Sequence, residues 1–251
     1  MSDSKFDRLV QEALNQEFRG WDFSWTHGRW HEENPSWNYR QLVQSRIREA
    51  KSLLDMGTGG GEFLASLKNL PKSAFATESY PPNVPVARAR LAPLGVTVLE
   101  ISDDRKLTLA DQAIDLVINR HESYWTSEVH RILKPQGIFL TQQVGSLDNI
   151  EINRFLGAPI KQSAKEWLLD KKIHYLRDAG FQILRAEEET LNCQFDDIGV
   201  IVFYLKIISW QIPDFSVEKY RDRLLALHNR IEKLGPFISK SHRYLVAAQK
   251  K

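Results

Sequence analysis

A glycine-rich segment, residues 52–62, constrains the fold more than any other part of the sequence. It opens with the apolar pair Leu53-Leu54, passes through Asp55 and places four glycines at positions 57 and 59–61. Apolar residues at helical spacing follow directly. This order of buried strand, glycine turn and helix is how an α/β sheet holds a nucleotide-like ligand. Glycine lets a ligand approach the backbone closely, and the N-terminus of the helix points at the ligand.

The spacing of the glycines indicates which class of ligand the loop is expected to bind. A dinucleotide loop needs Gly-x-Gly-x-x-Gly, but the sixth position is Glu62 when counted from Gly57 and Leu64 when counted from Gly59. A P-loop would end in Gly-Lys-Ser/Thr, whereas this loop ends in Gly-Glu-Phe. The pattern that does fit is Asp/Glu-x-Gly-x-Gly-x-Gly. A terminal glutamate would repel a pyrophosphate, but it is compatible with a ligand that carries a cation and no phosphate.

With Asp55, Gly57, Gly59 and Gly61 in this pattern, the segment resembles motif I of the class I S-adenosylmethionine-dependent methyltransferases. The resemblance implies that these residues, with Thr58 between them, bind S-adenosylmethionine. It covers residues 52–181 well and the rest of the chain in outline. Residues 128–140 also resemble the family's signature of a helix, a Leu-Lys-Pro-Gly-Gly turn and a strand, with a glutamine in place of the first glycine.

Acidic residues at two later positions extend the predicted cofactor site. A short predicted strand, residues 73–77, ends in Glu78, 23 residues after Asp55, where a carboxylate can accept both ribose hydroxyls. The resemblance assigns the ribose to Glu78, and Ser79 is placed beside it. Residues 102–117 resemble the family's adenine-binding stretch, which implies that Asp103 receives the adenine amino group and that the backbone amide of Asp104 faces a ring nitrogen. Serine and aspartate replace the family's glycine and alanine at positions 102 and 104.

The predicted fourth strand, residues 113–119, ends in a polar run that we expect to face the ligand, because ligands of open parallel sheets bind beyond the carboxyl ends of the strands. Asn119 and Arg120 would lie near the methionine part of the cofactor. His121 and Glu122 are the candidates for acid–base catalysis, since imidazole titrates near neutrality and a carboxylate can orient it. The alternative is that His121 only packs against the next helix, because methyl transfer needs little beyond alignment of the nucleophile.

Aromatic residues concentrate in residues 21–39, which have no regular period and predict an ordered loop. These rings either pack the N-terminal arm onto the domain or roof the active site, where they offer apolar walls and a face for a sulfonium cation. The candidate substrate-binding residues are Trp25, Trp30 and Trp37 of this arm, with Tyr124 and Tyr204 elsewhere. His27, His31 and Glu32 lie close together in sequence, but Gly28 interrupts them and the spacing is not that of a zinc protease, so no metal site is expected.

The C-terminal part predicts a helical insertion. Residues 197–210 are strongly apolar but too short to span a membrane, and Asp197 can cap them as a helix. Residues 146–163 predict a loop, residues 164–179 a helix and residues 181–187 the start of the sixth strand. Residues 216–234 form an amphipathic helix, and residues 244–248 a closing antiparallel strand. We therefore divide the chain into an aromatic N-terminal arm (1–50), a cofactor-binding core (51–195), a helical lid (196–240) and a closing strand (241–251). An insertion of this kind is usually a substrate lid.

The composition limits the kinds of partner that the chain is expected to bind. The 251 residues are 42% hydrophobic and 26% charged, and the formal net charge of +2 gives no global reason for binding nucleic acid or a membrane. The single Cys193 excludes an internal disulfide and suits a reducing cytoplasm, and the N-terminus lacks a signal-peptide pattern. No metal is expected beside the cofactor.

These observations together predict an α/β fold, a Rossmann-like seven-stranded mixed sheet with helices on both faces. The expected activity is S-adenosylmethionine-dependent transfer of a methyl group to a small-molecule N, O or C nucleophile. Two alternatives stay open: an RNA-base methyltransferase, suggested by the basic face of residues 216–234, and a cofactor-binding protein without catalytic activity. The sequence does not specify the acceptor or the oligomeric state.

Overall fold

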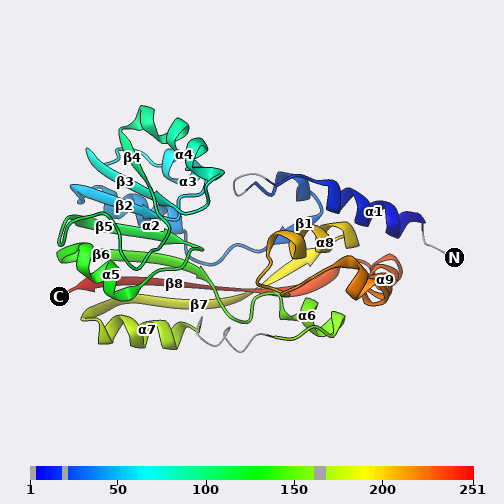
Figure 1. Cartoon of the computed structure of the whole chain (residues 1–251). Helices are drawn as coiled ribbons and strands as arrows, with labels where there is room; N and C mark the ends of the chain where they lie inside the picture. The colour runs from blue at the N-terminus through cyan, green and yellow to red at the C-terminus, as the bar shows by residue number, and fades with distance from the viewer. Residues whose placement is uncertain (1–3, 19–21, 161–167) are drawn as a thin grey trace.

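The computed structural model describes residues 4–18, 22–160 and 168–251, which form one mixed sheet flanked by helices (Figure 1). The strand order across the sheet is β1-β7-β8-β6-β5-β2-β3-β4. The strands are β1 (Trp30–Glu32), β2 (Ser52–Met56), β3 (Ser73–Glu78), β4 (Val96–Glu100), β5 (Ile114–Arg120), β6 (Leu133–Val144), β7 (Phe181–Phe195) and β8 (Phe237–Lys250).

Strands β2 to β6 pair in parallel, whereas β8 lies antiparallel between β6 and β7, and β1 lies antiparallel to β7 at the edge. The order reverses direction between β2 and β5, and a ligand crevice forms at such a switch point. The helices are α1 (Ser4–Asn15), α2 (Tyr39–Ile47), α3 (Glu62–Ala65), α4 (Asn83–Leu91), α5 (Thr126–Ile132), α6 (Ile150–Leu156), α7 (Leu169–Asp178), α8 (Ile198–Ile207) and α9 (Val217–Leu234), with 3-10 turns at Ser24–Thr26 and Ala92–Leu94.

Alternation along the central strands buries two apolar faces. Leu53 and Leu116 point toward a core that includes residues of α2, α3 and α4, while Leu54 and Val117 point toward a core with α5 and α7. Because successive side chains of a strand point to opposite sides of the sheet, these buried runs explain why helices cover both of its faces.

A third core lies at the far end of β7 and β8, which run the length of the molecule (Figure 1). Helix α8 supplies most of it, since Ile198 through Leu205 are all buried. Helices α1, α6 and α9 pack around α8. The side chain of Asp197 accepts a hydrogen bond from the amide of Val200, so the predicted capped apolar helix is confirmed. The molecule thus has a sheet-centred end and a helix-rich end joined by two long strands.

The predicted fold class is confirmed, but the strand count was wrong. The eighth strand is β1, which falls in the stretch predicted to be a loop. The ring of Trp30 stacks on Phe195 with centroids 5.7 Å apart, and its indole N–H donates to the Cys193 sulfur at 2.9 Å. A three-residue strand held by a partner more than 160 residues away leaves no periodic signal in the sequence.

Three other boundaries differ from those predicted. The expected turn at residues 134–137 is an irregular part of β6, where Gln136 has a φ of 65° and the pairing with β5 shifts register. Strand β7 continues to Phe195, and β8 begins at Phe237, because the two pair with each other along their whole length. The predicted loop at 146–163 contains α6. Trp21 and residues 164–167 of the predicted helix 164–179 lie outside the described residues. The division into arm, core and lid stays a prediction.

Among the described residues, no helix is both long enough and apolar enough to cross a membrane.

Candidate functional site

A cavity of about 1800 Å³ opens at the carboxyl ends of β2, β3, β5 and β6 and extends toward the helix-rich end. One end is lined by the glycine loop and the residue after β3, and the other by the arm, α8 and the segment after it. The polar run after β5 lies on the wall of the same cavity. Most of the predicted cofactor residues and two of the candidate substrate residues, Trp30 and Tyr204, therefore share one cavity.

The glycine loop is fixed by β3 and by the residues after β5. The amides of Gly57 and Thr58 donate to the hydroxyl and the carbonyl oxygen of Thr77, at 3.2 and 2.9 Å. Gly57 has a φ of 70°, and a β-carbon built there would lie 2.3 Å from Cγ of Glu122. A glycine is needed at this position because both the backbone conformation and the neighbouring glutamate exclude a side chain. Gly57, Thr58 and Gly59 line the cavity.

Gly61 closes the loop against α4. Its φ is 81°, and a β-carbon there would lie 2.8 Å from Cγ of Leu91, so this glycine allows close packing of the two helices. Gly61 is not among the residues that line the cavity. Arg90 of α4 bonds both the carbonyl of Gly60 and the carboxylate of Glu62, which fixes the outer part of the loop.

Asp55 lies beneath the loop and is 4% exposed. Its carboxylate accepts a hydrogen bond from the Thr58 hydroxyl at 2.8 Å. Burial raises the pKa of Asp55 to about 6, although the Thr58 bond and the nearby Arg120 act in the opposite direction. A buried carboxylate of this kind gains from a cationic ligand, and Asp55 lines the cavity.

Glu78 is held at the end of β3 with 5% exposure and lines the cavity together with Ser79. One carboxylate oxygen accepts the amide of Tyr80 at 2.7 Å, so the side chain is oriented by its own turn. The other oxygen has no hydrogen-bond partner within the described part of the chain. This geometry suits the hydroxyl-accepting role that the resemblance implies for Glu78.

The two residues assigned to adenine, Asp103 through its carboxylate and Asp104 through its backbone amide, lie outside the cavity lining. Asp103 bonds the side chain and the amide of Arg105, and that contact holds its pKa below the ordinary value. Asp104 accepts a hydrogen bond from the hydroxyl of Ser123 at 3.0 Å. Neither residue lines the cavity formed by the described residues, although Ser123 does. The structure does not bring Asp103 together with the other predicted cofactor residues.

Asn119 and Arg120 are neighbours with different roles. Asn119 is fully buried, and its amide bonds Thr141, Gln143 and the carbonyl of Met56, so it joins the ends of β2, β5 and β6 from below the cavity. Arg120 projects its guanidinium into the cavity wall, 5.6 Å from the centre of the Phe63 ring.

The candidate catalytic residues, His121 and Glu122, line the cavity. His121 is half-buried with a φ of 61°, its amide donates to the carbonyl of Gln142, and its Nε2 lies 3.3 Å from the Gln142 side-chain nitrogen. Burial and the nearby Arg243 and Arg120 lower the pKa of His121 well below its ordinary value, so the imidazole is neutral at pH 7. Desolvation raises the pKa of Glu122, whose carboxylate bonds Ser123.

The candidate aromatic residues separate into two groups. Trp30 and Tyr204 line the cavity, whereas Trp25, Trp37 and Tyr124 do not. Trp25 packs on Phe203 and lies under the Arg29 guanidinium at 4.4 Å. Trp37 donates its indole N–H to Gln142 at 2.8 Å and so reaches His121 only through that amide. Tyr124 packs edge-on against Phe139 beneath the sheet. Both readings of the aromatic arm therefore have support, each for different rings.

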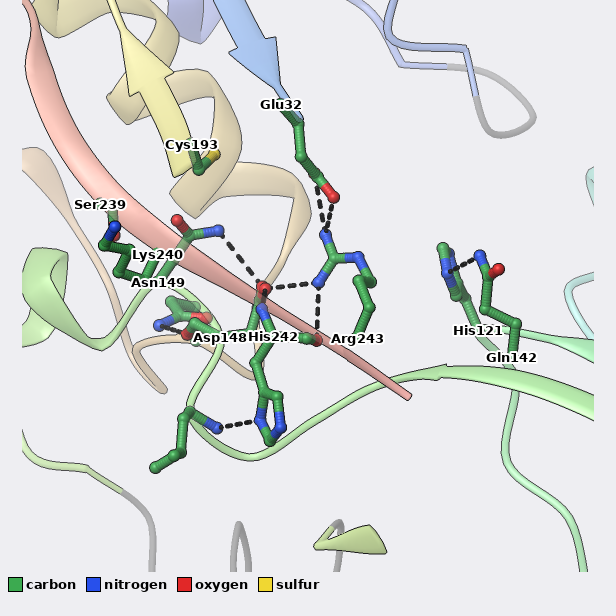
Figure 2. A network of polar contacts seen from close by, with 12 residues as sticks. Glu32, His121, Gln142, Asp148, Asn149, Cys193, Ser239, Lys240, His242 and Arg243 are labelled. Atoms are coloured by element: carbon green, nitrogen blue, oxygen red, sulfur yellow. Dashed lines mark hydrogen bonds and ion pairs between the residues drawn. The ribbon is translucent and has the colours of Figure 1, made fainter. Parts of the chain in front are cut away.

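A buried ionic cluster that the sequence did not indicate lies at the helix-rich end of the cavity. Figure 2 shows Arg243 of β8 between Glu32 of β1 and Asp148 of the loop after β6. Arg243 bonds Glu32 at 2.8 Å and also bonds Asp148, whose carboxylate accepts the amide of His242 at 2.9 Å. Although burial alone would lower the pKa of Arg243, the two carboxylates raise it. Burial raises the pKa of Glu32.

Neutral polar groups continue this cluster. The hydroxyl of Tyr204 lies 3.3 Å from Asp148 and donates to the side chain of Gln211 at 3.1 Å. Gln211 in turn donates to the side-chain oxygen of Asn153 at 2.7 Å. All four residues line the cavity and come from four different segments. The result is a preformed polar floor surrounded by apolar residues, which is the usual composition of a small-molecule site.

Sequence reasoning missed most of this floor. A usable signal existed at Gln142 and Gln143, because amides on an otherwise apolar central strand are expected to have buried partners. Glu32 was weighed only as a metal ligand, and its carboxylate instead pairs with Arg243. Asp148 and Arg243 gave no local signal, because their partners lie far away in the sequence.

Residues 54–141 match the family model of a methyltransferase domain. The match covers the glycine loop, Glu78, Asp103 and the run after β5. No curated protein matches the chain in sequence.

Solved structures agree in fold. A candidate methyltransferase from Bacillus halodurans C-125 is 18% identical with a TM-score of 0.61, over 85% of this chain and 98% of the other. An S-adenosylmethionine-dependent methyltransferase from Mesorhizobium loti is 13% identical with a TM-score of 0.50, over 85% and 98%. The [4+2]-cyclase SpnF is 18% identical with a TM-score of 0.53, over 98% and 94%. These similarities show the class I methyltransferase fold and do not identify an acceptor.

Proposed function

Because residues 54–141 form a methyltransferase domain of the class I, S-adenosylmethionine-dependent family, we propose that this chain transfers the methyl group of S-adenosylmethionine to a small-molecule N, O or C nucleophile. The observation that carries the proposal is the single cavity that joins the glycine loop to the polar floor of Asp148, Arg243 and Tyr204. An acceptor bound on that floor would face the donor directly, with His121 and Glu122 on the wall between them.

We call the part of the cavity that is lined by the glycine loop and Glu78 the donor end. Its residues fit this cofactor by their charge. Asp55, Glu78 and Glu122 all line it, so the wall carries carboxylates and would repel a phosphate-bearing ligand. S-adenosylmethionine has no phosphate and carries a sulfonium and an ammonium cation. Asp55 would favour the cationic part, Glu78 would accept ribose hydroxyls, and Gly57 to Gly59 would follow the ligand along the loop backbone.

When bound, the cofactor supplies an electrophilic methyl group on sulfur. The chain would contribute alignment, since the glycine loop and the polar floor line one cavity together with His121 and Glu122. His121 is neutral at pH 7 and can accept the proton that a nucleophile loses, and Gln142 fixes the ring. Glu122 serves the same purpose for an ammonium acceptor that must first lose a proton.

Two alternatives have less support. For RNA, the basic face of α9 is partly used within the protein, since Arg221 pairs with Asp7 at 2.6 Å and Arg230 lies over Phe237 at 5.3 Å. The second alternative is a cofactor-binding protein without catalytic activity, and the similarity to a [4+2]-cyclase shows that this fold also occurs in a protein named for other chemistry than methyl transfer. The cytoplasmic location stays a prediction that rests on the single cysteine.

Methyl transfer from S-adenosylmethionine labelled in the methyl carbon separates these possibilities. The protein is incubated with pooled small amines, phenols and carboxylic acids, and separately with total RNA. Label in a small-molecule fraction supports the proposal, and label in RNA that weakens steeply with rising salt supports the RNA alternative. Binding of the cofactor with no label in either fraction would contradict a methyltransferase function.

The role of His121 is checked by the pH profile of the same reaction. Because the pKa of His121 is depressed, its base form persists below pH 6.5, and we expect kcat/KM to stay level between pH 7.5 and 6.5. His121→Gln should lower kcat with little change in KM. A profile that falls with a midpoint near 6.5 would mean that a solvated group acts as the base.

A further inference from the structure

Strand β1 brings an aromatic ring and a carboxylate to the same cavity. Trp30 and Glu32 are two residues apart on this strand, and both line the cavity. Because successive side chains of a strand point to opposite faces, the two side chains leave the same face from α-carbons about 7 Å apart. The residue between them, His31, instead places its Nε2 3.3 Å from a carboxylate oxygen of Asp196. We call the part of the cavity that Trp30, Glu32 and the polar floor line the acceptor end.

Further aromatic rings adjoin Trp30 at the acceptor end. The ring centroids of Phe23 and Tyr204 lie 5.4 and 5.5 Å from that of Trp30, both edge-on. The Phe18 ring lies 5.1 Å from Phe23. All four rings line the cavity. Aromatic faces attract cations through their quadrupole, so this wall suits a positively charged group as well as an apolar one.

The carboxylate of Glu32 keeps capacity for a further hydrogen-bond donor. Both of its oxygens accept the same Nη2 of Arg243, at 2.8 and 2.9 Å (Figure 2). A carboxylate offers about four acceptor positions, and the Glu32 side chain is 27% exposed. The Asp148 side chain is only 9% exposed and accepts both Arg243 and the amide of His242. Glu32 is therefore the carboxylate of this cluster that is more open to a ligand.

The charges around Glu32 favour a cationic ligand. Burial raises the pKa of Glu32, Arg243 acts in the opposite direction, and Asp148 raises the pKa further, so one shared guanidinium does not offset two carboxylates. The imbalance extends along the cavity, because its described lining includes eight carboxylate side chains and only four from arginine or lysine. S-adenosylmethionine, with two cations and one carboxylate, would offset a single charge. The remaining negative charge attracts cations and repels anions.

We propose that the acceptor carries a cationic nitrogen and that the carboxylate of Glu32 binds this nitrogen at the acceptor end. The inference rests on the proposed function and names a substrate class for it: amines that are protonated near neutral pH. The bond to Glu32 is charge-assisted and anchors the acceptor, while the rings around Trp30 contact its apolar part. A neutral acceptor would gain nothing from the charge of Glu32, and an anionic acceptor would be repelled by it.

The test compares three probes that share one ring and differ in charge: benzylamine, benzyl alcohol and benzoate. Each is titrated by calorimetry into the protein saturated with S-adenosylhomocysteine, so that the donor end is occupied and the probe meets the acceptor end. Benzylamine should bind about tenfold or more tightly than benzyl alcohol, and benzoate should bind most weakly. This comparison needs no variant.

Substitution of Glu32 locates the effect. Glu32→Gln removes the charge but keeps an oxygen that can accept from Arg243, so the fold should persist, which thermal unfolding checks. The variant should bind benzylamine about tenfold to a hundredfold more weakly and benzyl alcohol as the wild type does. Glu32→Asp keeps the charge and should keep the preference for benzylamine.

The matched control is Glu33→Gln, which removes the same charge one residue further along. Glu33 also lines the cavity, but its carboxylate accepts the amide and the side chain of Asn192, at 2.8 and 2.7 Å. We expect this variant to change benzylamine affinity by less than about twofold, because an exposed charge away from the ligand is screened.

Two results would overturn the inference. One is a wild-type protein, saturated with S-adenosylhomocysteine, that binds benzylamine no better than the other two probes or does not bind it. The other is a folded Glu32→Gln variant whose benzylamine affinity is unchanged, or falls only as much as that of Glu33→Gln. A wild-type protein that does not bind S-adenosylhomocysteine would instead contradict the proposed function, so the two failures are distinguishable.

Discussion

The two ends of the cavity are built in opposite ways. The donor end consists mainly of one continuous segment, residues 55–63, and of Glu78 on the adjacent strand. The acceptor end brings together Glu32, Asp148 and Arg243, which lie far apart in the sequence and meet only because β1, β7 and β8 extend beyond the central sheet. The residues of the donor end can therefore be recognised from a short stretch of sequence, whereas those of the acceptor end come together only in the folded chain.

The largest expected effect is at the acceptor end. Arg243→Met should lower the free energy of unfolding by about 3–5 kcal/mol, because Glu32 and Asp148 would remain close together with their shared cation removed. Urea unfolding measures the loss. Arg185→Met on the neighbouring strand is the matched control, since Arg185 forms a surface pair with Glu187 and should cost about 1 kcal/mol or less.

Binding of S-adenosylhomocysteine to Arg243→Met should change little as long as the variant is folded, because Arg243 belongs to the other end of the cavity. A large loss of that binding in a folded variant would break the distinction between the two ends.

The next largest expected effect is a gain in stability when Asp55, at the donor end, is replaced. The folded-state pKa of Asp55 is raised to about 6 from 3.8, so the folded protein binds this proton more tightly than the unfolded chain does. Stability is therefore lost as the pH rises from about 4 through 6, by an amount on the order of 3 kcal/mol. Asp55→Asn should be more stable than the wild type at pH 7.5 and equal to it near pH 4.

Unfolding measured at both pH values checks this sign. An Asp55→Asn variant that is less stable than the wild type at pH 7.5 would mean that other groups of the protein stabilise the charged carboxylate. Burial of Asp55 would then not lower the stability of the folded protein.

The glycine loop gives the third prediction. Gly57→Ala should cost about 1–3 kcal/mol of unfolding free energy and weaken S-adenosylhomocysteine binding, because φ is 70° and the new methyl group would meet Glu122. Gly28→Ala is the control with the same backbone strain, since Gly28 has a φ of 73° and nothing within 4 Å of the added carbon. Equal effects of the two variants on stability would show that the contact with Glu122 contributes nothing.

The smallest effect concerns the aromatic arm. Trp30→Phe keeps an aromatic ring on Phe195 but removes the indole N–H that donates to Cys193, so we expect a loss of about 1 kcal/mol in unfolding free energy. Trp25→Phe, outside the cavity, keeps its packing on Phe203 and serves as the comparison. If only Trp30→Phe alters acceptor affinity, Trp30 acts on the acceptor in addition to packing the arm.

The same contrast explains which parts of the molecule could be predicted from the sequence. The strands of the central sheet, the capped helix α8 and the residues of the glycine loop are determined by neighbours in the sequence, so periodicity and spacing predicted them. Strand β1 and the full lengths of β7 and β8 depend on pairing between distant segments, so the sequence predicted a loop and two short strands there.

The candidate site shows the same limit. Asp55 and Glu78 lie where strand ends place them, and both line the cavity. Asp103 was assigned by resemblance alone; its carboxylate bonds Arg105, and it is not among the described residues that line the cavity. Arg243 could not be found, because a buried arginine is distinguished from a surface one only by its carboxylate partners.

The most direct test of the donor end is calorimetric titration of S-adenosylhomocysteine into the wild-type protein and into Gly59→Arg. Gly59 lines the cavity with a φ of 61°, and an arginine there would fill the space beside the loop. We predict binding of one ligand per wild-type chain and none in the variant, with a cooperative unfolding transition in both. No binding to the wild type, or equal binding to a folded Gly59→Arg variant, would contradict the assignment of the glycine loop to the methyl donor.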